Sequence, residues 1–70
     1  MNEYTDQQRI ARAFLTESRK CIEYHHRVQL EHHRRIQDGY IRTAIRYRLP
    51  VEEIERITGR EVGDLIDDHN

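Results

Sequence analysis

The sequence has little of what a disulfide-stabilised domain or an enzyme requires. Its 70 residues include no Trp, one Phe, one Cys, one Pro and three Gly. A single Cys cannot form an internal disulfide, and no signal peptide is recognisable, so we expect a protein of the reducing cytoplasm. With so few loop-forming residues there is little from which to build a preorganised pocket, and we expect no enzymatic activity, cofactor or small-molecule substrate.

Long hydrophobic runs are also missing. No stretch approaches the 18–20 apolar residues, roughly, of a membrane-spanning helix, so we expect no membrane association. Apolar and charged residues each make up 36% of the chain. A core built from so few apolar residues stabilises a small domain only marginally, and self-association is the usual remedy. We therefore expect a homodimer.

The apolar residues that are present recur with helical spacing, and alternating β-branched runs are absent, which predicts an all-α fold. Thr5 and Gln8 form a capping box at the start of a first helix that we predict over residues 5–37. One stripe of this helix has steps of three, four or seven residues. It consists of Ile10, Phe14, Cys21, His25, Val28, His32 and Ile36. We expect this stripe to form the dimer seam.

A helix over residues 5–37 would be about 50 Å long, which is too long for a chain of this size to cover. We favour an intertwined homodimer in which a second copy covers it, and we place its end at Gly39, a typical left-handed C′ residue. Two alternatives stay open. The helix breaks near residues 21–26, or it continues through Gly39.

The last third of the chain predicts short helices. A second helix over residues 40–48 ends at Leu49-Pro50, because the residue before proline avoids the α region. Pro50 is well placed to begin a helical hairpin over residues 50–68, in which Gly59 ends the first helix. The second helix of this hairpin is expected to bury Val62, Leu65 and Ile66.

This hairpin resembles the helix–turn–helix segment of small bacterial and phage transcriptional regulators. The resemblance covers about 20 residues and is carried by the order Pro50-Val51-Glu52-Glu53-Ile54, Ile57-Thr58-Gly59, Val62 and Leu65. It implies a tight turn at Gly59, with aliphatic residues of the second helix packing back on the first. The alternative is a helical hairpin that only packs.

Three departures from that pattern bear on function. Glu55 stands where the family usually has Ala, and Arg60 stands where it usually has an apolar residue. The presumed recognition helix carries carboxylates and lacks the side chains that read base edges, so phosphates would repel it. Some phage proteins of this kind dimerise and attach to a host repressor instead, and the resemblance implies such a co-regulator, with a LexA-type repressor as one target.

The charges divide along the chain into a basic middle and an acidic tail, with net charges of about +5 over residues 19–48 and −5 over residues 49–70. Such a split can dock the tail on the middle or present two faces to different partners. The residues expected to contact a transcription-factor partner are Glu52, Glu53, Glu61 and Asp64. The basic residues expected to contact DNA or a partner are Arg34, Arg35, Arg42, Arg46 and Arg48.

Three functions follow from these patterns. The leading hypothesis is a dimeric regulator that binds another transcription factor. The second is a direct DNA binder that uses the basic middle, and the third is a structural or assembly dimer. Cys21 and His25 have the i, i+4 spacing that chelates Zn²⁺ from a helix, but the remaining ligands would have to come from a second protomer. Packed histidines in the seam are the simpler interpretation, and no metal site is predicted.

Overall fold

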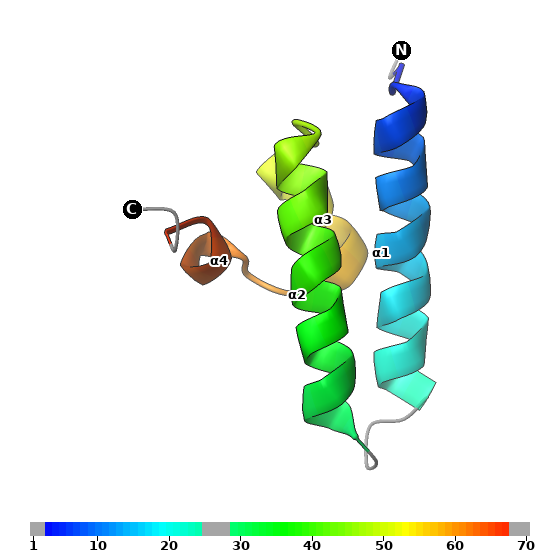
Figure 1. The fold of residues 1–70 in the computed structure, drawn as a ribbon, viewed down its shortest axis with the longest axis vertical. Coiled ribbons are helices and arrows are strands. Elements are labelled where there is room, and N and C mark those ends of the chain that lie inside the picture. The colour runs from blue at the N-terminus through cyan, green and yellow to red at the C-terminus, as the bar shows by residue number, and fades with distance from the viewer. Residues whose placement is uncertain (1–2, 25–28, 68–70) are drawn as a thin grey trace.

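A computed structural model describes residues 3–24 and 29–67, except the side chains of Asp64 and Asp67, and this part of the chain contains helices and no strand. The helices are α1 (Asp6–Tyr24), α2 (Leu30–Arg46), α3 (Val51–Thr58) and α4 (Gly63–Asp67). Helices α1 and α2 form an antiparallel hairpin, and α3 packs against both of them (Figure 1). Helix α4 packs against α2. The predicted all-α fold is confirmed.

The start of α1 confirms the predicted capping box. Thr5 N–H donates to Gln8 Oε1 at 3.0 Å, and Gln8 N–H donates to Thr5 Oγ1 at 3.1 Å. The side chain of Gln8 has a second role, since its Nε2 donates to the carbonyl oxygen of Tyr47 at 2.9 Å. One residue therefore caps α1 and ties it to the end of α2.

The predicted single helix over residues 5–37 is wrong, as is its end at Gly39. Helix α1 ends at Tyr24, in agreement with the alternative break near residues 21–26, and α2 continues through Gly39. Buried residues on both sides of Gly39, namely Gln37 and Ile41, hold this helix against the rest of the chain. Their packing outweighs the penalty of about 1 kcal/mol for glycine in a helix interior. The helix length therefore no longer argues for an intertwined dimer.

The core lies where α1, α2 and α3 meet. Its buried apolar residues are Ala11, Leu15, Ile41, Ala44, Leu49, Ile54, Val62 and Leu65. Helix α1 contributes Ala11 and Leu15, which are adjacent in sequence to the predicted stripe residues Ile10 and Phe14. Ile10 and Phe14 are themselves 55% and 48% exposed. The stripe expected in a dimer seam is therefore not the one that packs inside the chain, and spacing alone does not show on which side of α1 the other helices pack.

The C-terminal segment follows the predicted stops but not the predicted pairing. Pro50 is the N-cap of α3, and Gly59 ends α3 in the left-handed conformation with φ 73°, its N–H donating to the Glu55 carbonyl oxygen at 2.7 Å. Val62 and Leu65 are buried as expected. However, α4 packs against α2, so the structure does not confirm a helix–turn–helix pairing of α3 with α4.

Glu55 and Arg60, the two single-residue departures from the helix–turn–helix pattern, explain why α4 packs against α2. The Glu55 side chain accepts the Val62 N–H at 3.2 Å, which fixes the connection after Gly59. Arg60 reaches α2, where its NH1 donates to Gln37 Oε1 at 2.8 Å and lies 2.8 Å from Asp38 Oδ1. Together these contacts direct residues 60–62 toward α2 and carry α4 with them.

Candidate interaction surfaces

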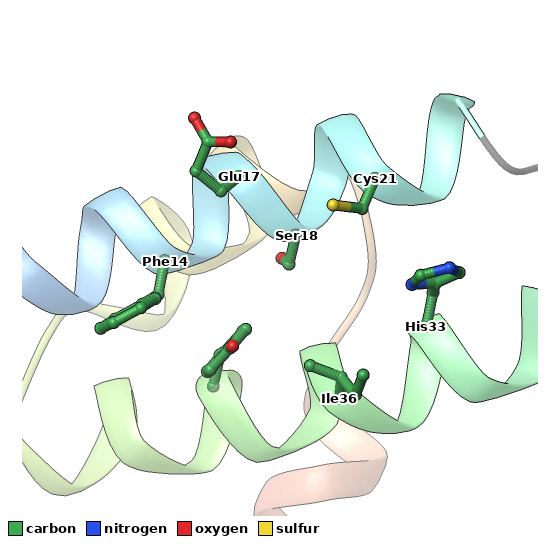
Figure 2. A pocket seen from close by; sticks show the side chains of 7 residues that line it. Phe14, Glu17, Ser18, Cys21, His33 and Ile36 are labelled. Carbon is green, nitrogen blue, oxygen red and sulfur yellow. The ribbon is translucent and has the colours of Figure 1, made fainter.

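A shallow apolar groove runs between α1 and α2 (Figure 2). Its volume is about 220 Å³, and it is lined by Phe14, Glu17, Ser18, Cys21, His33, Ile36 and Tyr40. At one end the rings of Phe14 and Tyr40 stack with centroids 5.1 Å apart. We call this groove, together with Ile10 one turn before Phe14, the open face.

The open face exists because α3 covers only the other side of the hairpin. On α1, the residues that bind α3 are Arg12, which pairs with Glu53, and Arg19, whose NH1 donates to the Ile57 carbonyl oxygen at 3.1 Å. Arg12 and Arg19 are seven residues apart. Phe14 and Cys21 are also seven residues apart, and each follows one of these arginines by two residues. Because a helix has 3.6 residues per turn, a two-residue offset turns these side chains away from α3.

The structure brings several predicted seam residues together on this face. Phe14, Cys21 and Ile36 line the groove, and Ile10 extends it. His32 is exposed outside the groove, which is lined by its neighbour His33. His25 and Val28 lie outside the described residues. His33 was missed, and Tyr40 was not assigned to the seam, because their place opposite α1 depends on the antiparallel register of α2, which the sequence alone does not show.

Charged side chains are scarce on the open face. Glu17 is the one carboxylate that lines the groove, and no Lys or Arg lines it, although 36% of the chain is charged. Charge depletion together with exposed aromatic side chains is the compositional mark of an interface core. The open face therefore has the character of a protein-binding surface.

The predicted basic residues divide into a ridge and two outliers. Arg35, Arg42 and Arg46 are exposed at intervals of seven and four residues, which places them along one outward side of α2. We call these three residues the arginine ridge. Arg34 lines a second pocket beside Gly59, and Arg48 lies beyond the end of α2 with φ 67°.

The predicted acidic surface is not assembled. The Glu53 carboxylate is largely buried and binds Arg12 and Arg56, so its charge is already paired within the chain. Burial beside these two cations satisfies its charge within the chain. Glu52 and Glu61 are exposed, but Glu52 lies in the first turn of α3 and Glu61 in the connection between α3 and α4. The Asp64 side chain lies outside the described part of the structure.

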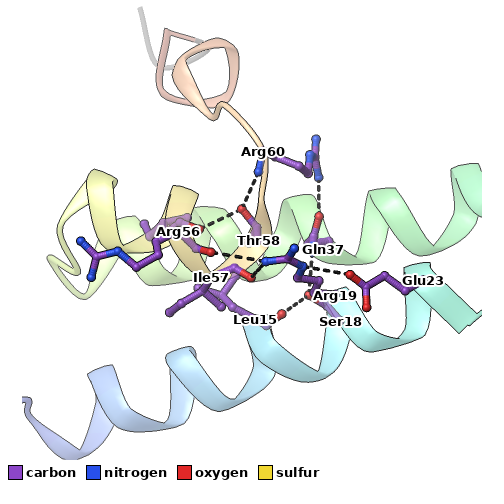
Figure 3. A network of polar contacts seen from close by, with 10 residues as sticks. Leu15, Ser18, Arg19, Glu23, Gln37, Arg56, Ile57, Thr58 and Arg60 are labelled. Carbon is purple, nitrogen blue, oxygen red and sulfur yellow. Dashed lines mark hydrogen bonds and ion pairs between the residues drawn. The ribbon is translucent and has the colours of Figure 1, made fainter.

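A polar network on the α3 side fixes the C-terminal segment (Figure 3). Ser18 Oγ donates to the Leu15 carbonyl oxygen at 2.7 Å, and the buried Gln37 donates from Nε2 to Ser18 Oγ at 3.0 Å. Arg60 completes this chain through Gln37 Oε1. The ion pair between the tail and the basic middle thus joins Arg60 of the tail to Asp38 of the middle. The net charges of the two segments suggest the opposite arrangement, with carboxylates of the tail bound to cations of the middle.

No cluster of candidate metal ligands is found among the described residues. They contain no group of three or more His, Cys, Asp or Glu residues that could hold a metal ion, and Cys21 is an exposed free thiol. Within residues 3–24 and 29–67, none of the helices has both the length and the apolar character needed to cross a bilayer. Comparisons with models of protein families, with characterised proteins and with solved structures found no match to this chain.

Proposed function

We propose that this chain is a small, non-enzymatic transcription-regulatory protein of the phage type, which acts as a homodimer and binds a bacterial regulator. A host repressor of the LexA type is the first candidate partner. The observation that carries the proposal is the position of α4. The helix that would have to read DNA is packed against α2 and is not paired with α3.

Helix α4 is poorly suited to a major groove. It has five residues, which is about 7 Å of helix. Residues 63–67 contain two Asp and no Lys, Arg, Asn or Gln, so they offer neither phosphate contacts nor the side chains that read base edges. A regulator with this segment acts better through another protein than through its own operator.

The arginine ridge provides the polar contact surface for such a partner. Its three guanidinium groups extend along one side of α2, and arginine is enriched in protein interfaces because it forms bidentate bonds with carboxylates. The partner that fits this surface is a regulator with an exposed acidic patch in the bacterial cytoplasm.

The proposal is tested by titrating the labelled chain with purified bacterial repressors, beginning with a LexA-type repressor, in the presence of nuclease. We expect saturable binding that weakens at least about tenfold in the variant with Arg42→Ala and Arg46→Ala. Arg9→Ala is the control, because Arg9 is exposed on α1 away from the ridge. Equal binding by all three proteins would exclude the ridge as the contact surface.

A second candidate function is direct binding of nucleic acid through the same ridge. It is favoured by the linear arrangement of the three arginines, which suits a row of phosphates. In that case Arg42→Ala and Arg46→Ala would lower the affinity for all DNA sequences alike and reduce the salt dependence of binding. A protein partner would not be needed.

A further inference from the structure

We propose that the open face is closed by a second copy of this chain, in a four-helix bundle where α1 of each copy packs against α2 of the other. This inference rests on the proposed function only for the homodimer, and it names the surface and orientation through which that dimer forms. It does not depend on which regulator is bound.

The first argument is the amount of apolar surface left uncovered. Ile10, Phe14 and Ile36 are 55%, 48% and 39% exposed, and all three lie on the open face. Among the described residues, the core buried within the chain has eight apolar members, two of which are alanine. A domain of this size is marginally stable alone, and covering the open face would add a second apolar layer to the hairpin.

The second argument is shape. The open face is formed by two antiparallel helices, and the common way to close such a face is to pack it on another helical pair. The register of the hairpin is fixed by contacts that place Gln8 level with Tyr47, Phe14 level with Tyr40, and Ser18 level with Gln37. A two-fold axis parallel to the two helices keeps each residue of one copy at the same height along the bundle as the same residue of the other copy. The stacked Phe14–Tyr40 pairs of the two copies then meet.

The third argument is charge, which selects this orientation. The helical spacing places Asp6 and Glu17 along the outer edge of the open face on α1, and Arg35 and Arg46 along its outer edge on α2. When α1 of one copy faces α2 of the other, Glu17 comes close to the level of Arg35 in the second copy. Lys20, which lies 3.7 Å from Glu17 within the chain, leaves that carboxylate between two cations.

The opposite orientation places like charges together. If α1 faced α1, the centre of the groove would bring Glu17 of one copy close to Glu17 of the other. Like charges across an interface cost binding energy and so select against that arrangement. The acidic edge of α1 and the basic edge of α2 are therefore complementary between two copies of the same chain.

The experiment is sedimentation equilibrium of the full chain, with circular dichroism to confirm that each variant keeps its helical content. We expect the wild-type chain to be a dimer and Phe14→Asp to be a monomer. Val51→Asp is the matched control, because Val51 is an exposed apolar residue at the start of α3, outside the open face. We expect this variant to remain dimeric. A monomeric wild-type chain, or a Phe14→Asp variant that stays dimeric, would overturn the proposal.

The orientation is tested by charge exchange. Glu17→Arg and Arg35→Glu should each raise the dimer dissociation constant by about tenfold, and the double variant should recover most of the loss. Failure of the double variant to recover would overturn the packing of α1 on α2. Since the chain is measured alone, a monomeric wild-type chain would overturn the homodimer of the proposed function as well, whereas regulator binding fails only if neither the dimer nor the monomeric variant binds a regulator.

Discussion

Two glycines with opposite surroundings show what single residues contribute to this fold. Gly59 has φ +73°, and a Cβ built on it would lie 3.3 Å from Cζ of Arg19. That guanidinium donates to the carbonyl oxygens of Arg56 and Ile57 at the end of α3. Gly39 lies inside α2 with nothing within 4 Å of the built Cβ. Glycine is therefore required at residue 59 and unfavourable at residue 39.

We predict that Gly59→Ala lowers the free energy of unfolding by about 1–2 kcal/mol, since a side chain is strained at positive φ and displaces the Arg19 cap. Gly39→Ala should raise it by about 0.5–1 kcal/mol through helix propensity. Urea denaturation at a fixed protein concentration measures both. Destabilisation by Gly39→Ala would show that α2 does not continue through this position.

Arg60 is the second residue whose role is specific to this structure, because it joins the tail to Gln37 and Asp38 of α2. Its removal leaves Gln37 Oε1 and the half-buried Asp38 carboxylate without this partner. We predict that Arg60→Ala lowers the free energy of unfolding by about 1–3 kcal/mol. Arg34→Ala, an exposed arginine of α2, should change it by less than about 0.5 kcal/mol. Similar effects of the two substitutions in thermal denaturation would contradict this role of Arg60.

At the scale of helices, local sequence signals predicted several helix ends, but the sequence did not show which side of each helix packs inward. The capping box at Thr5 and Gln8 and the end of α3 at Gly59 depend on neighbours within a few residues. Helix α2 ends at Arg46, two residues before the predicted end at residue 48. The choice between Gly39 and residues 21–26 as the helix break depends on which stripe packs inward. That choice is made by long-range contacts, such as Gln37 with Ser18, which spacing cannot show.

The candidate surfaces also combine features that spacing shows with features that depend on distant contacts. The apolar stripe with Phe14, Cys21 and Ile36 could be recognised from spacing, although its place on the open face could not. Glu53 was assigned to the surface because nothing in its local sequence reveals that Arg12, 41 residues earlier, binds it. An ion pair between distant residues leaves no periodic signal.

The connection between α3 and α4 gives a prediction at this scale. The Glu55 carboxylate accepts the Val62 N–H and holds the segment after Gly59 in place. We predict that Glu55→Ala speeds amide hydrogen exchange at Val62 and Leu65 while leaving α1 protected. Glu55→Gln keeps an acceptor oxygen and should exchange close to the wild-type rate. Equal exchange in both variants would contradict a role for this hydrogen bond.

At the scale of the whole molecule, the surfaces differ in character. The open face is apolar and nearly free of charged side chains, the arginine ridge follows the outward side of α2, and α4 packs against α2. Dimerisation through the open face would leave Arg42 exposed on both copies. The dimer would then present two basic surfaces to an acidic partner.

We propose that the chain regulates through protein contact and does not itself bind DNA. Fluorescence anisotropy with mixed-sequence duplex DNA, at about 50 mM and about 200 mM salt, tests it most directly. We expect no saturable binding at the higher salt and at most weak binding at the lower. Tight binding at low salt that collapses at high salt, and that is lost in the Arg42→Ala, Arg46→Ala variant, would overturn regulation through protein contact and make the arginine ridge a DNA-binding surface.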